Sequence, residues 1–191
     1  WTQLGETLDD AAGEAFDKGA KLLGLEFPGG AAIDREAVNG DPKAYALGKV
    51  ELKDPRDELN FSFSGLKSDF ARLVNRIPTA DRSVPDLSAA YQSALLDHLL
   101  GVVRRALRKT GSKSLAIVGG VARNRELRKR LELLQQAGEL DRWFAPAPEF
   151  CTDNAAMVGV LAFRKWQRGQ ISDLSADVRS TGRISRRNVS P

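Results

Sequence analysis

The sequence SLAIVGGVARN, residues 114–124, combines a short aliphatic run, two adjacent glycines and an asparagine. The aliphatic residues 115–118 predict a strand, and a helical pattern opens after Asn124. Its apolar face carries three leucines, Leu127, Leu131 and Leu134. Glycines let the backbone approach a ligand closely, and the first turn of a helix offers unpaired N–H groups to an anion. Strand, glycine turn and helix in this order are typical of ligand sites in α/β proteins.

A second unit of the same kind follows. Residues 143–145 predict a strand, prolines end it, and Cys151-Thr152-Asp153-Asn154 leads into a helix over 155–167. That helix is apolar nearly all round, which predicts that it is buried. Ligands of open α/β sheets bind at the carboxyl ends of parallel strands. We therefore expect Asn124 and Asp153 to lie near each other at one edge of a parallel sheet.

Composition excludes several classes of protein. The chain has 191 residues, 42% of them hydrophobic, and one cysteine, which leaves no internal disulfide framework. It contains no run of ~20 apolar residues and no signal-peptide pattern, so we expect a cytoplasmic protein that makes no membrane contact. The net charge of +4 is compatible with nucleic acid binding. Arginine clusters near residues 123–130 and in the tail are interpreted first as solvated surface.

The remaining chain is predicted to be mostly helical. A helix from about residue 10 to 23 carries Asp17 on an acidic face, and residues 39–60 predict a long surface loop. Phe61-Ser62-Phe63-Ser64 alternates with a period of two, as a half-buried strand does. A long helix to Thr110 includes His98, which we interpret as a packed structural residue because no further metal-binding side chain shares its face.

Local pattern alone leaves the chemistry open. Asp153 either caps the following helix or holds a metal ion or a magnesium-bound nucleotide. Asn124 alone predicts a helix cap, and Asp17 alone predicts a surface acid. A Ser/His/Asp arrangement is not available, since His98 is the only histidine. The residues support an α/β protein with a cleft for phosphate or a nucleotide, and they do not name a reaction.

Five ordered motifs resemble a universal enzyme family. They are GETLDDAAGEAFDKGAKLLGL (5–25), PGG (28–30), FSFSGLK (61–67), GGVARNRELR (119–128) and CTDNAAM (151–157), and SDLSADVR (172–179) matches the end of the bacterial form. The family is that of the tRNA adenosine threonylcarbamoyltransferases, TsaD in bacteria and Kae1 in archaea and eukaryotes. The resemblance covers nearly the whole chain.

The resemblance implies an ASKHA (actin-like, sugar-kinase-like, RNase H-type) fold with two lobes around a nucleotide cleft. It implies transfer of threonylcarbamoyl from threonylcarbamoyl-AMP to N6 of adenosine 37 in tRNAs that read ANN codons. Asp17, Gly30, Asp34 and Asn124 match positions that contact the nucleotide or the activated threonyl group. Asp153 matches a ligand of one divalent metal ion, iron or zinc. The implied partners are tRNA, a TsaB-like paralogue and a TsaE-like ATPase.

This sequence differs from the family's pattern at the N-terminal end. The two metal-binding histidines of the family and its Gly-Gly-His loop lie upstream of the part that matches this chain. We therefore expect a C-terminal portion, incomplete at the N-terminus, that is inactive and binds metal weakly by itself. Its expected organisation is a lobe over 1–168 with a helical insertion at about 31–110. A basic tail over 169–191 would return toward the missing N-terminal lobe.

Two other classes remain as alternatives. One is a different ASKHA enzyme, such as a sugar or acid kinase or an O-carbamoyltransferase, in which Asp153 helps to hold Mg-ATP. The other is a non-catalytic assembly module that resembles TsaB. Retention of Asp17, Asn124 and Asp153 argues against the second, whereas the absence of the family's histidines favours it.

Overall fold

The computed structural model describes residues 2–48, 54–173 and 175, which form a mixed α/β, helix-rich structure. The chain divides into two compact units, Trp1–Thr152 and Asp153–Pro191. The predicted lobe over 1–168 with its tail over 169–191 stays a prediction.

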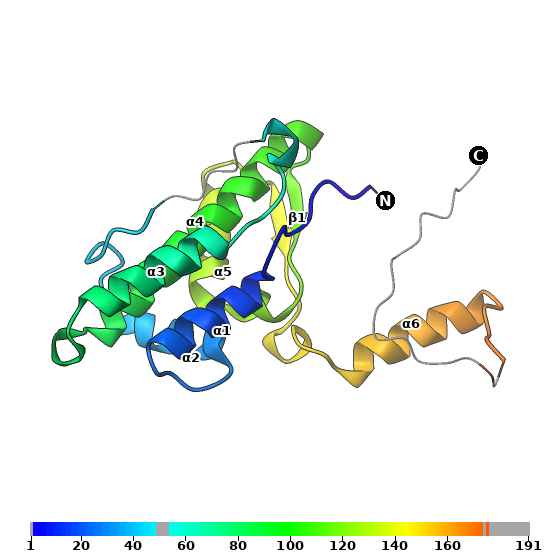
Figure 1. The fold of residues 1–191 in the computed structure, drawn as a ribbon. Helices are drawn as coiled ribbons and strands as arrows, with labels where there is room; N and C mark the ends of the chain where they lie inside the picture. The colour runs from blue at the N-terminus through cyan, green and yellow to red at the C-terminus, as the bar shows by residue number, and fades with distance from the viewer. Residues whose placement is uncertain (1, 49–53, 174, 176–191) are drawn as a thin grey trace. The chain divides into compact units, whose positions relative to one another are not determined.

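Helices make up most of the first unit (Figure 1). They are α1 (Ala12–Leu22), α2 (Gly29–Glu36), α3 (Ser64–Arg76), α4 (Val84–Thr110) and α5 (Arg125–Gln136). Short 3₁₀ turns lie between them: Ala37–Asn39, Pro55–Asp57, Thr79–Asp81, Gly120–Arg123 and Pro148–Phe150. Helix α1 packs on α2 and α3, and α2 packs on α4. This arrangement holds the start of α2 against α1, where two of the predicted site residues lie.

Aromatic side chains fill the contact between α1, α3 and α4. Phe16, Phe70 and Tyr91 are each at most 1% exposed. The rings of Phe70 and Tyr91 stack with their centroids 4.3 Å apart. The Tyr91 hydroxyl donates a hydrogen bond of 2.8 Å to the carbonyl oxygen of Ala15, so the ring is fixed at both ends. Burial raises the pKa of Tyr91 well above its usual value, which keeps this hydroxyl protonated.

The predicted strand–turn–helix–strand unit is confirmed in the first unit. Strand β1 (Ser114–Ala116) pairs in parallel with β2 (Arg142–Phe144), with Leu115 opposite Trp143. Helix α5 connects the two strands, as a parallel pair requires. Both strands are short, and β1 ends two residues before the predicted boundary at Val118. The turn at residues 119–124 therefore leaves the carboxyl end of β1, as the sequence predicts.

The strand predicted over residues 61–64 is wrong. Only an isolated parallel bridge between Thr7 and Phe61 forms, and α3 begins at Ser64. Beyond Phe61, most polar groups of this segment bond to the Asp9 carboxylate, and the Ser62 N–H bonds to His98. The Asp9 Oδ1 accepts from the Phe63 N–H at 2.8 Å and its Oδ2 accepts from the Ser62 hydroxyl. A carboxylate that collects several donors holds the chain in an irregular turn.

The structural interpretation of His98 is confirmed. Its Nε2 accepts a hydrogen bond of 3.3 Å from the Ser62 N–H. Its ring lies edge-on to the ring of Phe63, with 5.4 Å between their centroids. Burial lowers the pKa of His98, and the nearby Arg105 lowers it further. The neutral imidazole is the form that accepts from Ser62, so histidine here supports the turn before α3.

The second unit contains α6 (Ala155–Gln167), which forms over the predicted residues. Its cap is Asn154, whose side chain accepts from the Met157 N–H at 2.9 Å, rather than Thr152 or Asp153. Within the second unit this helix is exposed, and the prediction that it is buried stays a prediction. Trp166 is 63% exposed and Val158 61%. Apolar character all round predicts burial only where the unit supplies a second surface, and the described part of this unit contains one helix.

Among the described residues, no helix is both long enough and apolar enough to span a bilayer.

Candidate functional site

Asp17 lies on α1 where this helix faces the start of α2. Its Oδ1 accepts a hydrogen bond of 2.7 Å from the N–H of Gly29, the first residue of α2. A Cβ at Gly29 would lie 2.6 Å from the Asp17 Cα, so only glycine allows this approach. Carboxylates are favoured at helix N-termini by the partial positive charge there. The predicted surface acid is therefore half-buried and bonded to the neighbouring helix.

Gly30 follows directly and is the second residue of α2. A Cβ at this position would meet the Phe16 side chain at 3.7 Å, which is ordinary contact. The family resemblance places Gly30 and Asp17 around the same ligand, and the structure brings both to the start of α2. Steric need for glycine is therefore strong at Gly29 and weak at Gly30.

Asp34, one turn further along α2, binds Arg125 at the start of α5. The Arg125 Nε donates to Asp34 Oδ2 at 2.7 Å, and its backbone N–H donates to Oδ1 at 3.2 Å. A second guanidinium nitrogen donates to the Asp34 carbonyl oxygen at 2.8 Å. The Asp34 side chain is 14% exposed, whereas that of Arg125 is 62% exposed. This residue pair fixes α2 to the N-terminus of α5.

Asn124 caps α5, as the sequence predicts. Its Oδ1 accepts from the Leu127 N–H at 2.8 Å, and its Nδ2 donates to the Gln92 Oε1 on α4 at 2.6 Å. Asn124 is 7% exposed and Gln92 is 6% exposed. The two contacts join the glycine turn after β1 to the middle of α4.

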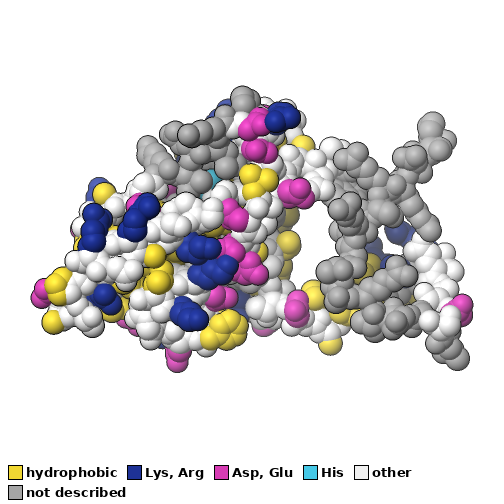
Figure 2. All heavy atoms as spheres, viewed as in Figure 1, with side chains coloured by type: hydrophobic (Ala, Val, Ile, Leu, Met, Phe, Trp, Pro, Cys, Tyr) yellow, Lys and Arg dark blue, Asp and Glu magenta, His cyan; other side chains and the backbone are white. Residues whose placement is uncertain are grey.

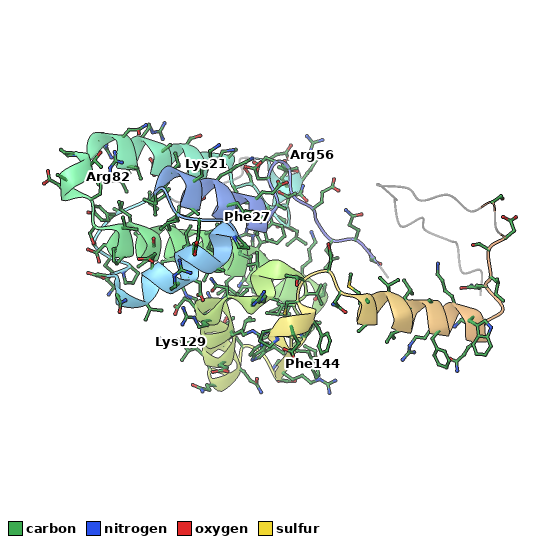
Figure 3. The ribbon with its side chains drawn as sticks, turned by 90° about the horizontal axis from the view of Figure 1, so that it is seen from below. Lys21, Phe27, Arg56, Arg82, Lys129 and Phe144 are labelled. Carbon is green, nitrogen blue, oxygen red and sulfur yellow. The ribbon has the colours of Figure 1, made fainter. Side chains whose placement is uncertain are left out.

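An open cavity of about 410 Å³ lies beside these contacts. It is bounded by α2 with its following turn, α4 and the first turns of α5, and its lining includes Asp34, Val38, Gln92, Arg125, Lys129 and Arg130. Lys129, labelled in Figure 3, projects from α5. Its walls combine apolar side chains with the Gln92 amide, the carboxylates of Asp34 and Glu126 and three cations that pair with carboxylates, which suits a polar organic ligand. The cavity is part of the first unit alone.

Most arginines of α5 bind other parts of the protein, which corrects their interpretation as solvated surface. Arg128 donates to the carbonyl oxygens of Ala122 at 2.7 Å and Pro146 at 2.8 Å. Arg130 donates to Asp97 at 2.7 Å and to Glu126 at 2.8 Å. These side chains hold the turns around the cavity and are not available as a simple basic surface.

Basic and acidic side chains are interspersed on the face that Figure 2 shows over α1 and α3. There Asp10 pairs with both Lys18 and Lys67, the latter at 2.8 Å. The side-chain hydrogen bond from Lys18, followed by that from Lys67, lowers the pKa of Asp10. This face therefore carries paired charges and not a field of one sign.

Asp153 belongs to the second unit and is exposed. Within the described ranges, no three His, Cys, Asp or Glu side chains gather closely enough to hold a metal ion. The residues of this chain that the structure describes do not fit a transition-metal site by themselves, because such sites use three or four protein ligands. No step below is assigned to a metal. The predicted approach of Asp153 to Asn124 joins two units and stays a prediction.

Sequence reasoning missed two residues of the site, Gln92 and Arg125. Local sequence pattern identifies Arg125 only as a member of a basic cluster. Gln92 follows Tyr91 on a mostly apolar buried face of α4 that also contains Ser88, and a large polar residue on such a face is the available signal. A buried amide requires partners, so Gln92 was identifiable as a residue with a polar contact but not as the partner of Asn124.

Comparisons with known proteins agree with the motifs. The family model described as TsaD, tRNA N6-adenosine threonylcarbamoyltransferase, matches residues 1–160. A protein of Pelobacter propionicus named tRNA N6-adenosine threonylcarbamoyltransferase is 45% identical over 188 residues, which cover 96% of this chain and 54% of the relative. The chain thus spans about half the length of the curated relative that it matches. Since the family model covers most of its length, the chain belongs to the TsaD family of tRNA N6-adenosine threonylcarbamoyltransferases.

Proposed function

We propose that this chain forms the nucleotide-binding, C-terminal part of an enzyme of t6A biosynthesis. The enzyme moves threonylcarbamoyl from threonylcarbamoyl-AMP to N6 of adenosine 37 in tRNAs that read ANN codons. In this proposal the first unit belongs to the C-terminal lobe of an ASKHA fold. The parallel strands β1 and β2 with α5 between them, followed by α6, support that assignment.

One observation carries the proposal. Asp17, Asp34 and Asn124, which match ligand-binding positions of the family, all occur in one compact unit around the start of α2 and of α5. Each is also held by a contact to a neighbouring element. A site whose side chains are fixed before the ligand arrives loses less entropy on binding.

The chemistry is an acyl substitution. The N6 nitrogen of adenosine forms a bond to the carbamoyl carbon, the bond from that carbon to the adenylate oxygen breaks, and AMP leaves as the N6 nitrogen loses a proton. The residues described here bind and orient the adenylate. Of the two Asp17 carboxylate oxygens, Oδ1 accepts a hydrogen bond from Gly29 and Oδ2 accepts none from the described residues, which leaves Oδ2 for a ligand hydroxyl. A carboxylate accepts such a bond strongly because it is charged.

The metal and the protein partners belong to the same proposal. One iron or zinc ion would need ligands beyond Asp153, supplied by the histidines that the family carries upstream. A TsaB-like paralogue and a TsaE-like ATPase are the proposed assembly partners, and tRNA is the proposed acceptor. Binding of tRNA should weaken as salt rises, because phosphate contacts release counterions.

Transfer of labelled threonine to tRNA tests the function. The protein, in the length that its gene encodes, is mixed with the enzyme that makes threonylcarbamoyl-AMP, the accessory subunits and tRNA. Label should appear on adenosine 37 of tRNAs that read ANN codons and not on a transcript with guanosine at that position. ATP-dependent modification of a sugar or an acid, without transfer to tRNA, would replace the proposal with the kinase alternative.

A control series separates binding from folding. Asn124→Ser keeps a side-chain oxygen that caps α5, whereas Asn124→Ala removes it. We expect both variants to lose nucleotide affinity. Both also lose the hydrogen bond to Gln92, and the alanine variant should be the less stable of the two because it loses the cap of α5 as well. Equal affinity in wild type and Asn124→Ser would remove Asn124 from the proposed contact.

A further inference from the structure

The Gln92 side chain on α4 is hydrogen-bonded to Asn124, and the donors and acceptors around the two side-chain amides determine the orientation of both. The Leu127 backbone N–H can only donate, so the atom of Asn124 that faces it at 2.8 Å is the oxygen. The Asn124 nitrogen then faces Gln92 and donates, so the facing atom of Gln92 at 2.6 Å is its oxygen. A flip of either amide would place two donors or two acceptors against each other.

The Gln92 amide nitrogen is left without a protein partner among the described residues. Gln92 lines the cavity although it is only 6% exposed. The only fully enclosed side-chain atom of the described residues that lacks a partner is Ser88 Oγ. Nε2 is therefore not fully enclosed by the protein. The oxygen of Gln92 points inward and supports the site residue.

We propose that Gln92 is a positioning residue of the transferase, which holds the Asn124 amide in the orientation that the nucleotide requires. This inference rests on the proposed function, because the contact of Asn124 with the nucleotide comes from it. The Gln92 carbonyl oxygen accepts from one of the two side-chain N–H groups of Asn124. The Leu127 N–H donates to one lone pair of the Asn124 oxygen. One N–H and one lone pair of Asn124 then have fixed directions for a ligand.

Two substitutions at Gln92 separate support of Asn124 from direct binding through Nε2. Gln92→Leu removes the acceptor and leaves the Asn124 N–H without a buried partner. Gln92→Glu keeps an oxygen toward Asn124, whether the carboxyl is charged or protonated, and removes the Nε2 donor. We expect Gln92→Leu to raise the KM for threonylcarbamoyl-AMP by about tenfold, the effect of one lost hydrogen bond, with the KM for tRNA within about twofold. We expect Gln92→Glu to retain most of the affinity.

A double-mutant cycle tests whether Gln92 acts through Asn124. In an Asn124→Ser background the hydrogen bond to Gln92 is already absent, so Gln92→Leu should add little. Gln135→Leu, an exposed glutamine on the same helix as the Asn124 cap, is the matched control and should leave both KM values unchanged. Full additivity of Gln92→Leu and Asn124→Ser would overturn the inference. Equal loss in Gln92→Glu and Gln92→Leu would overturn it as well.

A measurement without turnover keeps the test independent of the proposed function. In a ¹⁵N-labelled sample of this chain, the Asn124 side-chain amide should exchange its protons slowly, because it is buried and bonded. Gln92→Leu should remove that protection, while Gln92→Glu and Gln135→Leu should keep it. Protection unchanged in Gln92→Leu would refute the positioning role. If this chain shows the protection but the protein in the length that its gene encodes transfers nothing to tRNA, the proposed function is refuted and the Asn124–Gln92 contact stands.

Discussion

Removal of the Asp17 carboxylate should destabilise the protein as well as weaken ligand binding. Gly29 is buried, and the Asp17 Oδ1 accepts from its N–H at 2.7 Å. Asp17→Ala leaves that N–H without a partner at the start of α2, which costs ~1–3 kcal/mol. Asp17→Asn keeps an oxygen in the same place without the charge, and neutral hydrogen bonds are about half as strong as charged ones. We therefore expect Asn to cause about half the loss that Ala causes.

Thermal and urea unfolding of this chain measure the difference. For a chain of this size, the alanine variant should melt roughly 2–12 °C lower than wild type. Asp141→Ala is the matched control, since the Asp141 side chain is 67% exposed and lies 4.0 Å from its partner Lys113. It should unfold within about 0.5 kcal/mol of wild type. If Asp17→Ala unfolds like Asp141→Ala, the Asp17–Gly29 contact does not hold α2 and the argument fails.

Two further predictions concern the contacts that hold the first unit together. Burial raises the pKa of Asp9, but hydrogen bonds from the Phe63 N–H and the Ser62 hydroxyl outweigh it and lower the pKa to about 2. This lowered pKa adds stability that is present above about pH 4 and is lost as pH falls toward 2. Asp9→Asn should therefore reduce the change in the urea unfolding midpoint between pH 5 and pH 2, and an unchanged pH profile would refute this prediction. Gly19→Ala should lower the free energy of unfolding, because the added Cβ would lie 2.2 Å from the Tyr91 ring. Tyr91→Leu should partly restore stability in the double variant, and simple addition of the two losses would refute the clash.

Local sequence pattern predicted the elements whose causes are local. The cap at Asn124, the strand after residue 114 and the helix over 155–167 depend on residues within a few positions of each other. The strand predicted over 61–64 failed because its polar groups bond to Asp9, more than 50 positions away in sequence. Two apolar and two polar residues in alternation fit a strand and an irregular turn equally well. Four residues are too few for periodicity to decide between them.

Partners across the fold were beyond the reach of local pattern for the same reason. Hydrophobic periodicity places Gln92 on the buried face of α4, but it carries no information on which group meets its oxygen. The contact with Asn124 spans 32 positions, and that between Arg125 and Asp34 spans 91. The resemblance to a family identified Asp34 and Asn124 because their positions match its motifs. It did not identify the side chains that hold them.

These contacts change how mutations in the site must be interpreted. Asp17 bonds to a neighbouring element through one oxygen, Asp34 through both of its carboxylate oxygens, and Asn124 through its side-chain nitrogen. Each is proposed to meet the ligand with the lone pairs or N–H that remain. An alanine variant removes both interactions, so its loss of activity combines misfolding with weaker binding. Variants that keep the oxygen, such as Asp17→Asn and Asn124→Ser, retain part of the structural contact. A loss of nucleotide affinity in those variants as large as in the alanine variants, with a smaller fall in unfolding temperature, is the result that assigns the residue to the ligand.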